Sequence, residues 1–173
     1  MNIFYPDIYA KNIFEIDYEK LKDKGIKCLV FDLDNTLVPV KSSVADEKVK
    51  ALFATLKKQK FTIILMSNSL KKRVEVFKKD LKIPCFSFSI DLLKKNYKKL
   101  IKEYNFDMSE IACIGDQIMT DVWGANKMGF TSIFLDKLKK EDFKWTKLNR
   151  VAEKLILNHF HRQKRFTKGS YYD

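Results

Sequence analysis

Short apolar runs, rich in β-branched residues, recur along the chain and alternate with stretches of helical periodicity. Five runs have the length and composition of buried strands: 27–33, 61–66, 83–88, 110–114 and 131–135. Strands that alternate with helices in this way are typical of parallel sheets joined by crossover helices. The pattern therefore predicts an α/β fold, a doubly wound Rossmann-like parallel sheet of about five strands.

The stretches between these runs place apolar residues three and four positions apart, which is typical of helices with one buried face. The pattern is clearest at Val49, Leu52, Phe53 and Leu56, and residues 43–46 just upstream are a candidate cap. Further helices are expected around Val74 and Phe77; Leu93, Tyr97, Leu100, Ile101 and Tyr104; Val122, Ala125 and Met128, ended by Gly129; and Leu148, Val151, Ala152, Leu155 and Ile156. The segment before Gly25 is expected to form a covering helix with Leu21 packed inward.

The length of 173 residues, 46% of them hydrophobic, suits one globular domain. We assign residues 1–158 to this domain and 159–173 to a basic C-terminal tail outside the core. No apolar stretch approaches the roughly 18 residues needed to span a bilayer, and the first residues lack the pattern of a signal peptide. Three cysteines in separate apolar runs indicate a reducing compartment, so a cytoplasmic protein is expected.

The chain is strongly basic. Thirty-four Lys and Arg residues against 22 Asp and Glu give a net charge of +12. Such a field attracts nucleic acid, anionic lipid surfaces or phosphorylated ligands, and it would favour peripheral contact with the inner face of a membrane. The alternative is that the lysines only solvate helix faces, and both interpretations stay open at this point.

Polar residues gather where the predicted strands end. Asp32 and Asp34 follow the first run, residues 67–69 (Ser-Asn-Ser) follow the second, and Asp116 and Asp121 follow the fourth. Ligands of an open parallel sheet bind outside the carboxyl ends of its strands, so these side chains are expected to meet at one edge. Asp32 and Asp34 would share a face, and two close carboxylates are costly unless a cation or a proton compensates them. An enzyme that needs a metal, a nucleophile and a proton carrier in one place has a reason to keep them.

These motifs resemble those of haloacid-dehalogenase-type (HAD) phosphohydrolases. The chain is most similar to the YqeG-type subfamily of class IIIA, which is related to the mitochondrial phosphatidylglycerophosphate phosphatases. The resemblance covers roughly residues 4 to 155. It is carried by the segments 6–7, 14–16, 25–27, 32–38, 115–122, 124–126 and 149–150.

The resemblance implies roles for the acidic residues. Asp32 would be the nucleophile that forms an aspartyl-phosphate, and Asp34 would protonate the leaving oxygen and then activate water. Mg²⁺ would be held by the Asp32 carboxylate, the Asp34 backbone carbonyl and Asp116. Asp121 would be a supporting carboxylate on the metal side, and Thr36 would orient the loop.

The resemblance also implies a phosphate-binding set. Ser67 and the backbone amide of Asn68 would hold the phosphoryl oxygens. The family usually has a Lys-Pro pair after its third strand, where this chain has Asp91 and Leu92. Lys94 lies one helical turn after Asp91 and could replace the missing lysine, with Lys95 as the other candidate.

The spacers leave no room for a substantial cap domain, so an open site is expected, suited to a phosphate that protrudes from a bulky group. The first hypothesis is therefore a Mg²⁺-dependent phosphomonoester phosphatase, with phosphatidylglycerophosphate as the substrate that the resemblance suggests. The second is a catalytically weak basic module that binds RNA or ribosomal particles on a HAD fold. A third is a phosphatase for soluble sugar or nucleotide phosphates.

Overall fold

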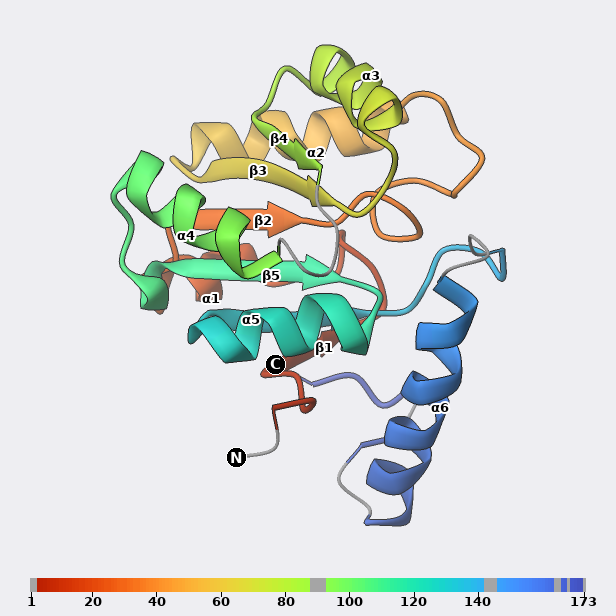
Figure 1. Ribbon diagram of the computed structural model, residues 1–173. Coiled ribbons are helices and arrows are strands. Elements are labelled where there is room, and N and C mark those ends of the chain that lie inside the picture. Colours follow the sequence, from red (N-terminus) through yellow and green to blue (C-terminus); the bar gives the residue numbers. More distant parts are fainter. Residues whose placement is uncertain (1–2, 88–92, 142–145, 164–165, 168, 173) are drawn as a thin grey trace.

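A computed structural model describes residues 3–87, 93–141, 146–163, 166–167 and 169–172, without the side chains of residues 93–94 and 146–148. Its centre is a six-stranded sheet in the order β1-β6-β5-β2-β3-β4 (Figure 1). Every pairing is parallel. The strands are β1 (Ile8–Ala10), β2 (Cys28–Phe31), β3 (Thr62–Ser67), β4 (Cys85–Ser87), β5 (Ile111–Gly115) and β6 (Thr131–Leu135).

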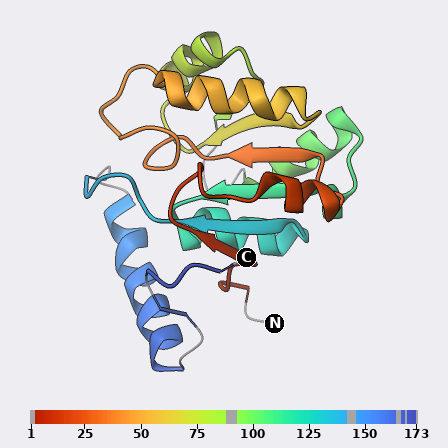
Figure 2. The ribbon, with the colours of Figure 1, turned by 180° about the vertical axis from the view of Figure 1, so that it is seen from behind.

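Helices cover both faces of the sheet, as Figures 1 and 2 show from opposite sides. Alternate strand residues pack against α1, α2 and α3 on one face and against α4 and α5 on the other. No helix in the described ranges is both long and apolar enough to cross a membrane. The helices are α1 (Tyr18–Asp23), α2 (Glu47–Lys58), α3 (Lys71–Leu81), α4 (Leu93–Tyr104), the short 3₁₀ helix η2 (Met108–Glu110), the π-helical turn η3 (Ile118–Val122), α5 (Trp123–Met128) and α6 (Thr146–Arg162).

The predicted α/β architecture is confirmed, and all five predicted strands form. The pattern missed β1, which has three residues and pairs with β6 at the edge of the sheet. The covering helix before Gly25 is present as α1, with Leu21 buried. Nothing of domain size interrupts the described ranges between strands and helices, as expected for a fold without a large cap.

Helix ends follow the local signals in the sequence. The Asp46 carboxylate accepts a hydrogen bond of 2.8 Å from the Val49 N–H and so caps α2, as residues 43–46 predicted. Gly129 ends α5 in the left-handed conformation (φ 74°), where a side chain would be strained. Local sequence signals therefore mark the start of α2 and the end of α5.

The C-terminal residues differ from the tail expected outside the core. Phe160 and Phe166 are buried in a small aromatic cluster with Tyr9 and Phe134. Within this cluster the Tyr9 and Phe166 rings lie 4.7 Å apart, centroid to centroid. Each buried aromatic ring removes a large apolar area from water. This gain explains why Phe160 and Phe166 pack against the domain although basic residues surround them in the sequence.

Candidate functional site

The loop after β2 turns sharply and buries both of its carboxylates. The Asp32 N–H donates to the Ile114 carbonyl at 2.9 Å, which continues the pairing with β5. Asn35 then takes a left-handed conformation (φ 65°), and its N–H donates to the Val38 carbonyl at 2.8 Å. Asp32 and Asp34 are both buried at the carboxyl edge of the sheet, near the point where its strand order reverses.

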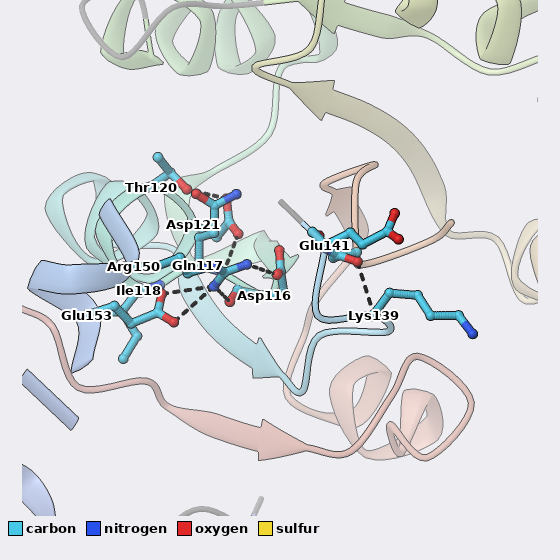
Figure 3. A network of polar contacts seen from close by, with 10 residues as sticks. Asp116, Gln117, Ile118, Thr120, Asp121, Lys139, Glu141, Arg150 and Glu153 are labelled. Atoms are coloured by element: carbon cyan, nitrogen blue, oxygen red, sulfur yellow. Dashed lines mark hydrogen bonds and ion pairs between the residues drawn. The ribbon is translucent and has the colours of Figure 1, made fainter. Parts of the chain in front are cut away.

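The Asn35 side chain ties this loop to the segment after β6. Its Nδ2 donates to the Glu141 carbonyl at 2.7 Å, and its Oδ1 accepts from the Lys139 N–H at 3.2 Å. Figure 3 labels the partners in these two contacts, Glu141 and Lys139. Asn35 therefore anchors the loop that carries Asp32 and Asp34 to residues 139–141.

Three buried carboxylates meet at this edge. Carboxylate oxygens of Asp32, Asp116 and Asp121 all lie within 4.8 Å of one another. They come from the ends of β2 and β5 and from the turn η3. Asp121 is held by the Gln117 N–H and by the Thr120 hydroxyl, each donating at 3.0 Å. The prediction that strand-end carboxylates meet at one edge is confirmed for these three.

Burial and mutual repulsion disfavour ionisation of the cluster. Burial raises the pKa of Asp32 well above its usual value, and the charges of Asp121, Asp116 and Asp34 raise it further. Burial also raises the pKa of Asp116 to about 7, against the opposing effect of Arg150, and that of Asp121 to about 6. A cation placed among the three carboxylates would remove this penalty.

Two oxygens of the cluster suit such a cation. Among the described residues, Asp32 Oδ2 and Asp116 Oδ1 are buried and have no hydrogen-bond partner. A buried polar atom without a partner costs free energy, so an unpaired atom in each of two neighbouring carboxylates indicates a ligand. Hard divalent cations prefer oxygen donors of this kind, and Mg²⁺ therefore fits the residues present.

Arg150 reaches the cluster from α6 (Figure 3). Its guanidinium donates to the Asp116 carbonyl at 2.7 Å and also to Asp116 Oδ2. The same nitrogen that contacts the carbonyl lies 2.9 Å from Glu153 Oε1, and Glu153 Oε2 accepts from the Ile118 N–H at 2.9 Å. Sequence reasoning noted Arg150 only as part of the resemblance and assigned it no place in the site.

The Asp34 carboxylate does not join this cluster. Its Oδ1 accepts from Arg73 Nη2 at 2.8 Å and from Nε at 3.1 Å, and its Oδ2 accepts from the Ser69 hydroxyl. Arg73 was missed from the sequence. The available signal was its position in the first turn of α3, the helix that follows β3 and therefore starts at the edge where the site lies.

Of the predicted phosphate-binding residues, Ser67 and Asn68 lie at the end of β3, next to Ser69, whose hydroxyl donates to Asp34. Ser67 is fully buried, and its Oγ accepts from the Ser69 N–H at 3.2 Å. Asn68 is half-buried at the end of β3. Thr36 is buried, and its hydroxyl has no hydrogen-bond partner among the described residues.

The lysine candidates fall partly outside the structure. Asp91 and Leu92 lie outside the described residues, and so does the side chain of Lys94, although its backbone belongs to α4. Lys95 is described and its side chain is exposed.

Comparison with known proteins relates the chain to phosphatases. A family model described as mitochondrial PGP phosphatase matches residues 1–138. The chain is 32% identical over 155 residues to the probable phosphatase YqeG of Bacillus subtilis (strain 168), and the match covers 90% of each protein. It is 25% identical over 154 residues to phosphatidylglycerophosphate phosphatase 1, chloroplastic/mitochondrial, of Arabidopsis thaliana, covering 79% of this chain and 42% of that protein.

Solved structures show the same fold at lower identity. One is the cobalt-bound deoxy-D-mannose-octulosonate 8-phosphate phosphatase of Haemophilus influenzae, with a TM-score of 0.52 and 14% identity over 80% of this chain and 90% of that one. Another is a magnesium complex of a HAD family enzyme from Bacteroides thetaiotaomicron, with a TM-score of 0.50. Its identity is 14%, and the match covers 71% of this chain and 98% of that one.

Proposed function

Because the chain belongs to the PGP phosphatase family and is a phosphoric monoester hydrolase, we propose that it works through an aspartyl-phosphate on Asp32 and requires Mg²⁺. One observation carries this proposal. Asp32 Oδ2 is buried and unpaired among the described residues, and Asp32 forms a cluster with Asp116 and Asp121 at the ligand-binding edge of the sheet. A carboxylate with an unpaired oxygen can hold a metal ion through that oxygen while its other oxygen attacks phosphorus.

The reaction proceeds in two steps. A carboxylate oxygen of Asp32 attacks phosphorus, the bond from phosphorus to the ester oxygen breaks, and a proton from Asp34 goes to the leaving oxygen. Asp34, now ionised, takes a proton from water, whose oxygen attacks phosphorus, releases inorganic phosphate and restores the Asp32 carboxylate. Arg73 would position the Asp34 carboxyl group for both steps through the ion pair of 2.8 Å between its Nη2 and Asp34 Oδ1.

Mg²⁺ supplies positive charge that offsets the repulsion between the phosphate and the carboxylates. Asp32 and Asp116 would hold it with their unpaired oxygens, together with the backbone carbonyl of Asp34. Asp121 would support the same site from the η3 turn, because one of its carboxylate oxygens lies within 4.8 Å of oxygens of Asp32 and Asp116.

Phosphate oxygens would be held beside Asp34. Ser67 and the backbone amide of Asn68 are the proposed donors from the end of β3, and Lys94 of α4 is the proposed cation. Thr36 would orient the loop between the two aspartates, and its unpaired hydroxyl is free to accept or donate there.

We further propose phosphatidylglycerophosphate as the substrate and an anionic membrane as the docking surface. The names of the family and of the plant relative support this substrate. A membrane-facing surface has physical support in three exposed apolar side chains near the site, Leu70 (71% exposed), Val44 (57%) and Val76 (45%). Exposed apolar residues next to lysines are typical of surfaces that bind anionic lipid.

The apolar surface is continuous with the catalytic edge. Val44 lies between Ser42, whose carbonyl accepts from Arg73, and Ala45, whose N–H donates to Asp80 near the end of α3. The loop from residue 42 to 45 therefore runs along α3. An open groove of about 300 Å³ is lined by Ser43, Leu70, Lys72, Arg73, Val76 and Phe77. One of its lining residues, Arg73, contacts Asp34, so a lipid docked here would bring its headgroup toward the site.

Phosphate release from an aryl phosphate tests the reaction. We expect turnover with Mg²⁺ that a chelator removes, and a loss on the order of 10³-fold or more in Asp32→Asn, because the nucleophile is lost. Asp46→Asn is the matched control, since asparagine also caps α2 and should leave turnover unchanged. Unchanged turnover in Asp32→Asn would refute the mechanism. Absent turnover together with RNA binding that survives the substitution would favour the RNA-binding module instead.

Vesicles that contain phosphatidylglycerophosphate test the docking surface. Leu70→Ser should lower turnover on anionic vesicles by roughly threefold to tenfold, because an apolar contact with the bilayer is lost, and should spare turnover of the aryl phosphate. Leu70 is the N-cap residue of α3 and makes no capping bond, and serine is favoured at N-caps, so folding should not suffer. Leu155→Ser, equally exposed on α6, is the control. Equal effects of both substitutions would exclude α3 as the docking surface.

A further inference from the structure

We infer that Arg150 and Glu153 of α6 form a positioning pair that orients Asp116 toward the metal, an inference that rests on the proposed function. Both residues lie beyond residue 138, where the family model ends. Their contacts nevertheless converge on residues 116–118, at the end of β5. The last helix would thus complete a metal site that the strands begin.

Arg150 divides the roles of the two Asp116 oxygens. Its guanidinium binds Oδ2, while Oδ1 stays buried and unpaired among the described residues. A carboxylate that was free to rotate about its last bond would present either oxygen, or neither, to a cation. With Oδ2 held by Arg150, Oδ1 is the Asp116 oxygen left available to a cation in the cluster with Asp32 and Asp121.

Arg150 also fixes the backbone of the residue whose side chain it binds. One nitrogen donates to the Asp116 carbonyl at 2.7 Å and another contacts the Asp116 carboxylate. Two contacts from one planar group define an orientation, which the single ammonium of a lysine cannot do.

Glu153 holds Arg150 and the following turn together. Its carboxylate accepts from Arg150 at 2.9 Å and 3.1 Å, and from the Ile118 N–H at 2.9 Å. Asp116, Arg150, Glu153 and Ile118 therefore close a ring of contacts around residues 116–118 (Figure 3). Glu153 is buried, so water does not compete for these hydrogen bonds.

A purely structural role for the pair would be to anchor α6. Loss of an anchor would lower the thermal midpoint and leave the Mg²⁺ dissociation constant unchanged. Loss of a positioning pair would raise that constant even in a folded variant, because Asp116 Oδ1 would no longer be held in place. Metal affinity measured without substrate therefore separates the two roles.

Arg150→Lys and Glu153→Gln are the test variants, and Arg162→Ala, an exposed arginine on the same helix, is the control. Mg²⁺ binding is measured by calorimetry on the substrate-free protein, and the Mg²⁺ dependence of aryl phosphate turnover is measured in parallel. We expect the dissociation constant to rise about tenfold in Arg150→Lys and less in Glu153→Gln, which keeps one acceptor oxygen. Turnover at saturating Mg²⁺ should fall by a smaller factor than the affinity.

Unchanged Mg²⁺ affinity in both variants, with an active wild-type protein, would overturn the positioning pair and leave the proposed function standing. A wild-type protein that neither binds Mg²⁺ nor releases phosphate would overturn the proposed function itself. If Arg150→Lys does not fold, Glu153→Gln decides alone, because it preserves the size of the side chain.

Discussion

At Gly115, the last residue of β5, a missing side chain makes room for the acidic cluster. A Cβ built at this position would lie 2.0 Å from Asp121 Oδ2 and 2.6 Å from Asp121 Cβ. Neither atom could yield without moving the η3 turn, because Asp121 is held there by Gln117 and Thr120. The close approach of Asp121 to the strand therefore requires glycine.

Gly115→Ala should consequently displace Asp121 and weaken the metal site. We expect turnover to fall by about tenfold or more, and the free energy of unfolding to fall by about 1–3 kcal/mol, as for other overpacked positions. Turnover at several Mg²⁺ concentrations and unfolding in urea would measure both effects. Wild-type values for both would contradict the argument.

At the residue scale, the acidic residues of the site could be predicted from the sequence, but the arginines that contact them could not. Asp32 and Asp116 follow strands directly, and the rule that parallel strands end at one edge is enough to bring them together. Arg73 and Arg150 lie on helices, and their reach depends on how each helix is inclined to the sheet. Hydrophobic periodicity does not determine that angle, so neither arginine could be placed in advance.

At the scale of elements, periodicity identified the strands and helices that span the core, and failed where the packing is unusual. β1 has only three residues, too few for a period to be recognised. α6 was predicted from the apolar spacing of Val151 and Leu155, yet these side chains are 61% and 67% exposed. Glu153 and Phe160 are buried instead. α6 lies beside the sheet (Figure 1), where Glu153 contacts the Ile118 N–H and Phe160 packs in the aromatic cluster with Tyr9 and Phe134.

At the scale of the whole molecule, the buried carboxylates link stability to pH. The pKa of Asp116 is raised to about 7 and that of Asp121 to about 6. Aspartates in an unfolded chain have a pKa of about 3.9. Between about pH 4 and about pH 7 the metal-free folded protein thus binds more protons than the unfolded chain. These two groups therefore make the free energy of unfolding fall as pH rises through this window.

The proposed Mg²⁺ would replace the protons on these carboxylates, so it should stabilise the protein more at about pH 8 than at about pH 5. Thermal unfolding with Mg²⁺ and with chelator, at both pH values, would measure the difference. In chelator, Asp116→Asn should weaken the fall of the thermal midpoint between these pH values, since that titrating group is gone. A Mg²⁺ effect that is equal at both pH values in the wild-type protein would contradict this linkage.

The parallel pairing of β1 with β6 sets an order of events during synthesis. Ile8 lies opposite Ile133, and the Asp7 N–H donates to the Ser132 carbonyl across 125 positions of sequence. The Tyr9 backbone exchanges two further hydrogen bonds with Tyr172, at 2.8 Å and 2.9 Å. β1 thus acquires its partners only after β6 and Tyr172, which lie far later in the sequence, have been synthesised. Until then the nascent sheet keeps an open margin at β5, where a chaperone or a neighbouring chain can bind.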